Sequence, residues 1–214
     1  MIRGIQALAL FMTLQCFSLL NTSLAGDDIH LWNTLTLSHS INENWRLHFG
    51  TDQKFVDDIS KHGIRTVFTG TSYKAANNLF FGFEIRHHEK KSGGQWLEEN
   101  RFAPFMIWKN TFDSLSLTFR ERTELRTREG NENWVSRNLL KLAVVSGTAS
   151  PYVSNELFYD LTAATFTENR LSIGLDLAVF KNLNTSLYYL YKSNEKDRGW
   201  SVTNVFGTSL TLHP

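Results

Sequence analysis

Four charged residues occupy every second position of one segment: Arg120, Arg122, Glu124 and Arg126. Successive residues of a β-strand point to opposite faces, so this spacing places all four side chains on one face. Guanidinium and carboxylate groups on a shared face can pair through charge-assisted hydrogen bonds, or an excess of arginine can attract anions. Which chemistry applies depends on the elements that hold the charged faces.

Alternation of apolar and polar residues identifies those elements as strands. From Arg170 to Val179, apolar residues such as Leu171 and Ile173 fall on one face, whereas Arg170 and Asp176 fall on the other. The period is two residues rather than that of a helix, and it therefore predicts a two-faced β-strand.

Comparable runs recur almost to the end of the sequence. Eleven are predicted, at 29–39, 44–55, 64–74, 79–88, 96–109, 112–127, 134–145, 152–161, 166–179, 184–192 and 200–212. Several reach about ten residues or more, the length of a tilted strand that crosses a bilayer. Because single-chain bacterial barrels have even strand numbers, we expect that one run is split or missed, or that the first lies outside the wall. The predicted strand number is therefore about 10–12.

The predicted connections are of two kinds, which mostly alternate along the chain. Short turns are expected at 40–43, 76–78, 110–111, 147–150 and 181–183. Longer charged or glycine-containing loops are expected at 56–63, 89–95, 128–133 and 193–199. Short turns at one rim and longer loops at the other, outside the cell, are typical of outer-membrane barrels.

The first 25 residues have the form of a cleaved signal peptide. Arg3 supplies a positive start, a mostly apolar run follows, and Ser23-Leu24-Ala25 has the small-x-small form of a cleavage site. Cleavage near Ala25 would leave 26–214 as one outer-membrane barrel domain without cysteine, because Cys16 is the only cysteine. The predicted location is the outer membrane of a Gram-negative envelope.

The predicted fold class is all-β: a transmembrane antiparallel up-and-down β-barrel of about 10–12 strands that follows the signal peptide. A soluble periplasmic β-protein, with its apolar faces turned inward, would show the same alternation. Strand length, loop asymmetry and aromatic residues near strand ends favour the membrane. These aromatic residues are Trp45, Phe55, Tyr73, Trp96, Trp108, Trp134, Tyr191 and Trp200.

If the apolar faces contact lipid, the charged faces line the lumen. The candidate lumen charges are Arg46, Glu84, Arg86, Glu99, Arg101, Arg120, Arg122, Glu124, Arg126, Arg137, Lys141, Glu156, Arg170, Asp176 and Lys192, with Asp52 and Lys54 on the same faces. They predict either a narrow anion-preferring porin or a closed structural barrel filled by Arg/Glu pairs. Glu121 falls on the apolar side with Phe119, which a bulge after Phe119 or a position near the outer headgroups would explain.

No motif predicts catalysis or a cofactor. His30, His48, His87 and His88 are not grouped with serines in a recognisable way, so we expect no enzyme, although an outer-membrane hydrolase is an alternative. Because His87 and His88 point to opposite faces, at most His88 and a partner from another strand could share a metal site, and no metal is expected. The formal charge of +1 and the export signal do not favour nucleic acid as a partner.

Four segments carry a family resemblance: 97–102, 119–126, 151–158 and 169–175. In this order and spacing they resemble the bacterial family called domain of unknown function 2490. The resemblance implies an uncharacterised outer-membrane β-barrel and carries over no catalytic residues. The expected partners are outer-membrane lipid and lipopolysaccharide, the barrel-assembly machinery and small anionic solutes.

Overall fold

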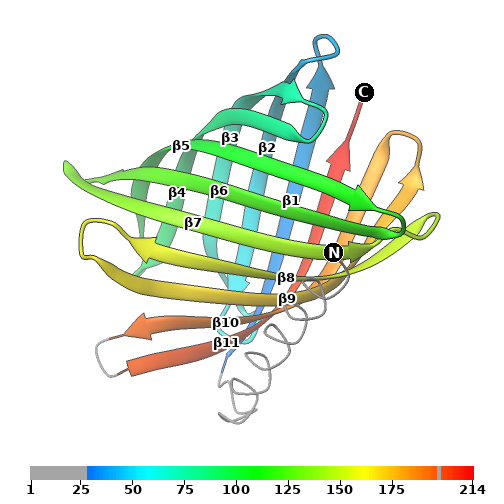
Figure 1. Cartoon of the computed structure of the whole chain (residues 1–214). Helices are drawn as coiled ribbons and strands as arrows, with labels where there is room; N and C mark the ends of the chain where they lie inside the picture. The colour runs from blue at the N-terminus through cyan, green and yellow to red at the C-terminus, as the bar shows by residue number, and fades with distance from the viewer. Residues whose placement is uncertain (1–27, 197–198) are drawn as a thin grey trace.

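Eleven strands form one closed barrel in the computed structural model, which describes residues 28–196 and 199–214 (Figure 1). The strands are β1 (Ile29–Ser40), β2 (Trp45–Val56), β3 (Lys61–Ala76), β4 (Leu79–Ser92), β5 (Gln95–Phe112), β6 (Leu115–Arg128), β7 (Asn131–Val144), β8 (Ala149–Asp160), β9 (Thr165–Phe180), β10 (Leu183–Lys196) and β11 (Gly199–Leu212). Among these residues, no helix has the length and hydropathy needed to cross a membrane. The predicted signal peptide and its cleavage site lie outside the described residues.

The barrel closes through a parallel ladder between its first and last strands. Each other neighbouring pair is antiparallel, but β1 runs parallel to β11, with Leu35 opposite Leu210. The predicted all-β barrel of 10–12 strands is therefore confirmed. The expectation that one run was split, missed or outside the wall is wrong. With an odd strand number the first and last strands point the same way, so they can close the wall only in parallel.

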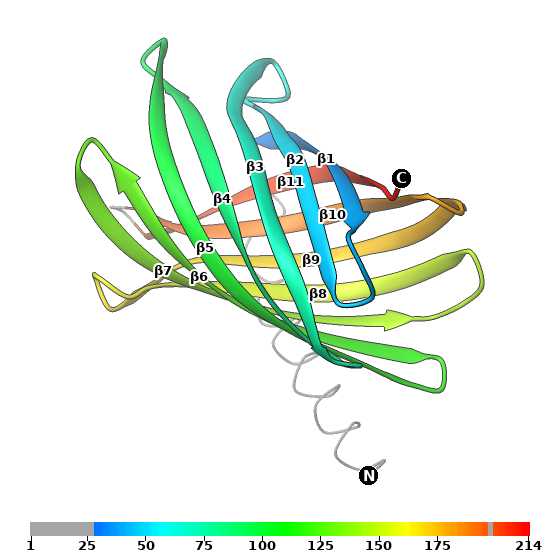
Figure 2. The ribbon, with the colours of Figure 1, turned by 90° about the horizontal axis from the view of Figure 1, so that it is seen from above.

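Period-two alternation decides which side chains face outward. Leu35, Phe49, Ile85 and Ile173 each expose about half or more of their surface, while polar residues beside them in the same strands face inward. The strands are strongly inclined, and in Figure 2 strands on opposite walls of the barrel cross at a steep angle. Such inclination is required to close a sheet into a barrel, and it brings residues of different strands to one level of the lumen.

The predicted difference in loop length between the rims is wrong. The segments expected as loops at 89–95 and 128–133 are mostly strand, and their turns contain only Gly93-Gly94 and Glu129-Gly130. Gly93 and Gly130 have φ of 57° and 80°, a left-handed conformation that allows two-residue turns. Charged residues beside these turns are compatible with strand ends that meet water on both faces. Loop length therefore gives no support for a membrane location.

Glu121 lies on the outward face near the middle of β6. It pairs with Asn138 of β7, and the register of these two strands has no shift, so the predicted bulge after Phe119 is wrong. Thr123 Oγ1 donates a hydrogen bond to the Glu121 carboxylate over 2.8 Å. This neighbour on the same face gives the carboxylate a local polar partner.

A small apolar cluster lies inside the barrel where β1, β10 and β11 meet. It consists of buried Trp32, Leu190 and Val205, with Tyr188 packed against them. Gly207 makes room for this cluster, because a Cβ there would overlap the Tyr188 ring. Elsewhere the inward faces carry many charged and hydroxyl side chains, which form the candidate site.

Candidate functional site

Most of the predicted lumen charges line one cavity of about 1050 Å³ inside the barrel. Those that line it are Glu84, Arg86, Glu99, Arg101, Arg120, Arg122, Arg126, Arg137, Lys141, Glu156, Arg170, Asp176 and Lys192. Glu124 is fully buried within the charged wall. Arg46 is exposed near the β1–β2 turn and does not line the cavity. The inward faces of β4 to β10 are thereby joined in a single site.

The cavity reaches both rims of the barrel. Thr148 and Asn184 line it beside the β7–β8 and β9–β10 turns. Near the other rim, the cavity is lined by Arg128 at the end of β6 and by Glu195 close to the end of β10. The lining thus follows the barrel over most of its height.

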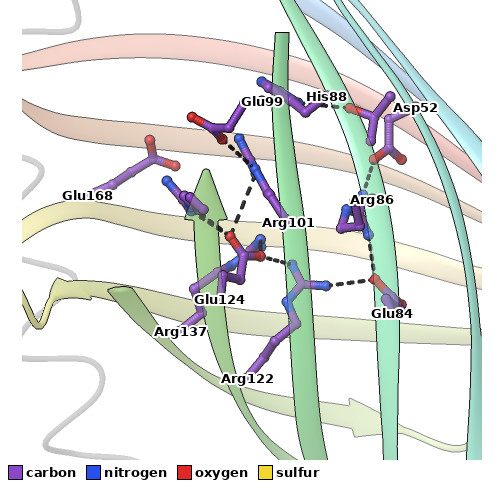
Figure 3. A network of polar contacts seen from close by, with 12 residues as sticks. Asp52, Glu84, Arg86, His88, Glu99, Arg101, Arg122, Glu124, Arg137 and Glu168 are labelled. Carbon is purple, nitrogen blue, oxygen red and sulfur yellow. Dashed lines mark hydrogen bonds and ion pairs between the residues drawn. The ribbon is translucent and has the colours of Figure 1, made fainter. Parts of the chain in front are cut away.

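Glu124 is the centre of the charged network (Figure 3). Its Oε1 accepts a hydrogen bond from Arg137 over 2.6 Å and lies 3.0 Å from an Arg122 nitrogen. Its Oε2 accepts a hydrogen bond from Arg126 over 2.6 Å and lies 3.6 Å from Arg101. A carboxylate with no exposed surface is stable only if its charge is compensated, and the four guanidinium groups provide that compensation.

A second part of the network joins β2, β4 and β6. Arg86 donates hydrogen bonds to Asp52 and, over 2.5 Å, to Glu84 (Figure 3). Arg122 lies 3.3 Å from the same Glu84 oxygen, which links this part to Glu124. Thr34 Oγ1 donates a further hydrogen bond to Asp52 over 2.8 Å. Each carboxylate here therefore has more than one donor.

A third part joins β6 to β9 around Glu156. Arg120 and Arg137 lie 2.8 and 2.9 Å from Oε1 of this carboxylate, and Arg170 lies 3.6 Å from Oε2. Arg170 also pairs with Glu168, two residues earlier on the same face. Arg137 therefore connects Glu156 to Glu124, and the three parts form one continuous network.

The ion pairs follow the wall of the barrel. Among the described residues, every inward ion pair joins residues of one strand or of strands no more than two apart around the barrel. The pairs that skip one strand include Arg120–Glu156 and Lys141–Asp176. A network that plugs a barrel would instead join opposite walls. These pairs stiffen the wall around the cavity.

Positive charge is in excess on the cavity surface. The basic side chains that line it are Lys54, Arg86, Lys90, Arg101, Arg120, Arg122, Arg126, Arg128, Arg137, Lys141, Arg170 and Lys192. The acidic ones are Asp52, Glu84, Glu99, Glu156, Glu168, Asp176 and Glu195. The arrangement can therefore attract anions, because pairing leaves part of the positive charge uncompensated.

Several lining residues were missed from the sequence for identifiable reasons. Arg128, Lys90 and Glu195 were assigned to loops because the predicted strands ended too early. Glu168 shares the inward face of β9 with Arg170, and the same alternation could have identified it.

The histidines take positions that differ partly from expectation. Inward His88 Nδ1 lies 2.9 Å from Thr66 Oγ1. Outward His87, and not His88, lies near two carboxylates, those of Glu89 and Glu98. Residues 87 and 89 share a face, and Glu98 is on the adjacent strand. Arg65, however, donates two hydrogen bonds to Glu89, over 2.5 and 2.7 Å. The charge of that carboxylate is therefore already paired with a guanidinium group.

Comparisons with known proteins agree with the family resemblance. No curated protein matches the chain. Among solved structures, the translocator domain of the autotransporter NalP from Neisseria meningitidis is similar, with a TM-score of 0.41 and 14% sequence identity. That match covers 75% of this chain and 71% of the NalP chain. A family model described as Protein of unknown function (DUF2490) matches residues 29–203, which confirms the predicted resemblance, and the chain therefore belongs to the DUF2490 family.

Proposed function

We propose that the protein is an outer-membrane barrel whose basic lumen passes small anions. The observation that carries this proposal is the course of the ion pairs, which follow the wall around a cavity of about 1050 Å³ lined from one rim to the other. Charged side chains that ring a passage set its ion preference, and the excess of basic groups favours anions here. No covalent chemistry is required of the site.

The outward surface supports a lipid environment. Large apolar side chains are exposed around the barrel, among them Leu35, Phe49, Phe83, Ile85, Leu157, Ile173, Leu187 and Phe206. So much exposed apolar surface is unfavourable in water and favourable in a bilayer. Strands of 12 to 18 residues exceed the roughly 9–11 that a tilted strand needs to cross. The ring centroids of Trp45 and Tyr73, 5.0 Å apart, begin an aromatic border near one rim.

A closed structural barrel is the second candidate function. It is favoured by Glu124, which has no exposed surface and is surrounded by Arg101, Arg122, Arg126 and Arg137. In such a barrel the charged network would brace the wall and also exclude ions. The two candidates predict different currents across a membrane.

Planar-bilayer conductance tests the proposal. The protein is extracted from outer membranes in detergent and added on one side of a bilayer with a potassium chloride gradient. Stepwise currents are expected, with a reversal potential close to the equilibrium potential of chloride. Heat-denatured protein is the control. Folded protein that gives no current would favour the closed barrel, and a preference for potassium would contradict the basic-lumen argument. Recovery of the protein from periplasm without detergent would contradict the membrane location itself.

A further inference from the structure

Lys54 is an inward lysine that has no carboxylate partner among the described residues. It points inward from β2 and lines the cavity, and its Nζ lies 3.8 Å from the centre of the Trp32 ring on neighbouring β1. In the part of the chain that the structure describes, its ammonium takes part in no ion pair or hydrogen bond with a side chain. Its contact with the indole face is a cation–π interaction, which leaves the donors of the ammonium available.

Two carboxylates near Lys54, one on its own strand and one on β9, are already engaged. Asp52, two residues away on the same face, is bound by Arg86 and Thr34. Glu168 is bound by Arg170 and lies 3.3 Å from Lys192 Nζ. Lys54 therefore adds to the cavity a basic group that none of the described carboxylates pairs with.

Trp32 adds a second unpaired donor beside this lysine. The indole is buried at 7% exposure, and its Nε1 has no acceptor among the described residues. Arg170 also approaches the indole, with its guanidinium carbon 4.9 Å from the ring centre. A buried donor without an acceptor is unfavourable, so an acceptor placed here gains from both the indole and the ammonium.

We propose that Lys54 and Trp32 form a binding subsite for a small oxyanion, such as a carboxylate or phosphate group, within the lumen. The oxyanion accepts hydrogen bonds from the Lys54 ammonium. A small movement of the lysine stem allows the same oxyanion also to accept a hydrogen bond from the Trp32 indole N–H. Arg170 adds attraction without giving up Glu168. The conductance part of the test rests on the proposed anion passage, whereas the binding part does not.

Lys192 provides a matched control for Lys54. Both are inward lysines that line the cavity, but among the described residues only Lys192 has a carboxylate partner, Glu168. Binding of inorganic phosphate to the whole barrel, in a detergent without phosphorus, is measured from phosphorus-31 line broadening. Lys54→Gln is expected to weaken phosphate binding about tenfold or more, and Lys192→Gln less than about twofold, because charge-assisted bonds are lost only in the first. Lys54→Arg keeps the charge and is expected to keep most of the affinity.

Several results would overturn the subsite. They are the absence of saturable phosphate binding to the unmodified barrel, equal losses in the Lys54→Gln and Lys192→Gln variants, and unchanged binding in Lys54→Gln. Heat-dependent gel mobility checks that each variant is folded. If Lys54→Gln does not fold, Lys54→Met serves in its place, because an unbranched stem can still pack on Trp32.

Block of the chloride current by phosphate separates this subsite from the proposed function. Weaker block in Lys54→Gln, with unchanged block in Lys192→Gln, supports both. A barrel that binds phosphate through Lys54 but carries no current contradicts the passage and supports the subsite. A conducting barrel whose phosphate block is the same in both variants contradicts the subsite and leaves the passage intact.

Discussion

Arg137 donates a hydrogen bond to Glu124 over 2.6 Å across the β6–β7 ladder, and both side chains are buried. The same arginine lies 2.9 Å from Glu156 on the next strand, so it joins two carboxylates that share no other partner in the network described above. Such a residue fixes the relative position of β6, β7 and β8. The stability of the wall should therefore depend on this group of charges more than on those near the rims.

Glu124→Gln is expected to destabilise the barrel. It leaves Arg101, Arg122, Arg126 and Arg137 without their common counter-ion, and removal of one partner from a buried ion pair typically costs about 3–5 kcal/mol. Urea unfolding in lipid vesicles, followed by gel mobility, measures the change. Glu132→Gln, at an exposed position of β7, is the control and should change the unfolding free energy by less than about 0.5 kcal/mol. An equal effect of both variants would contradict a central role for Glu124.

Lys141→Glu is expected to weaken anion preference. Lys141 lines the cavity and pairs with Asp176 over 2.6 Å, so the variant replaces an ion pair with two repelling carboxylates beside the proposed passage. The reversal potential in a potassium chloride gradient should move toward that of potassium. Lys109→Glu, an exposed position on β5 that does not line the cavity, makes the same charge change and should leave the reversal potential almost unaltered. Equal shifts in the two variants would mean that overall charge, and not the lumen, sets the preference.

Glu121→Leu is expected to stabilise the barrel in a bilayer. Glu121 faces outward from the middle of β6, where an apolar side chain contacts lipid more favourably than a carboxylate does. A gain of roughly 1–2 kcal/mol in unfolding free energy is expected, since charged groups on the lipid face are destabilising. Urea unfolding in vesicles measures it, with Thr123→Val as a control for loss of the neighbouring hydroxyl. A destabilised Glu121→Leu barrel would mean that the carboxylate has a partner in the membrane.

Gly207→Ala is expected to destabilise the barrel by forcing the Tyr188 ring to move. A Cβ at this position would overlap the ring, and such overpacking costs about 1–3 kcal/mol. Tyr188→Leu removes the overlap, so the double variant should lose less stability than the sum of the two single variants. Additive losses in this cycle, measured by urea unfolding, would contradict the packing of Tyr188 against Gly207.

Alternation alone was enough to assign the inward faces of the strands. Residues such as Arg122 and Ile173 point where period two places them, because this periodicity follows from local backbone geometry. The partners of the charges could not be predicted in the same way. Arg120 meets Glu156 across an intervening strand, which depends on the inclination of the closed barrel. That no described carboxylate pairs with Lys54 also depends on contacts made between distant strands.

The parallel pairing of β1 with β11, the seam of the barrel, could not be predicted from the alternation within single strands either. It pairs the two ends of the sequence, with Ile29 opposite Asn204, and no turn connects them to fix a register. The knowledge that bacterial barrels have even strand numbers also argued against it. The register of the seam therefore comes from the closure of the barrel and not from a connecting turn.

Cysteine pairing across the seam tests this register. Leu35 and Leu210 are directly opposite on β1 and β11 and both face outward. In a Cys16→Ser background, the variant with Leu35→Cys and Leu210→Cys should form an internal disulfide in the folded barrel, because opposed strand residues have suitable Cα separations. The pair Leu35→Cys and Val202→Cys, which is distant in this register, should remain reduced under the same mild oxidation. Gel mobility with and without reductant distinguishes the products. Cross-linking only between different chains would show that β1 and β11 do not close the barrel as described, because the seam would then be a free edge that pairs with a second molecule.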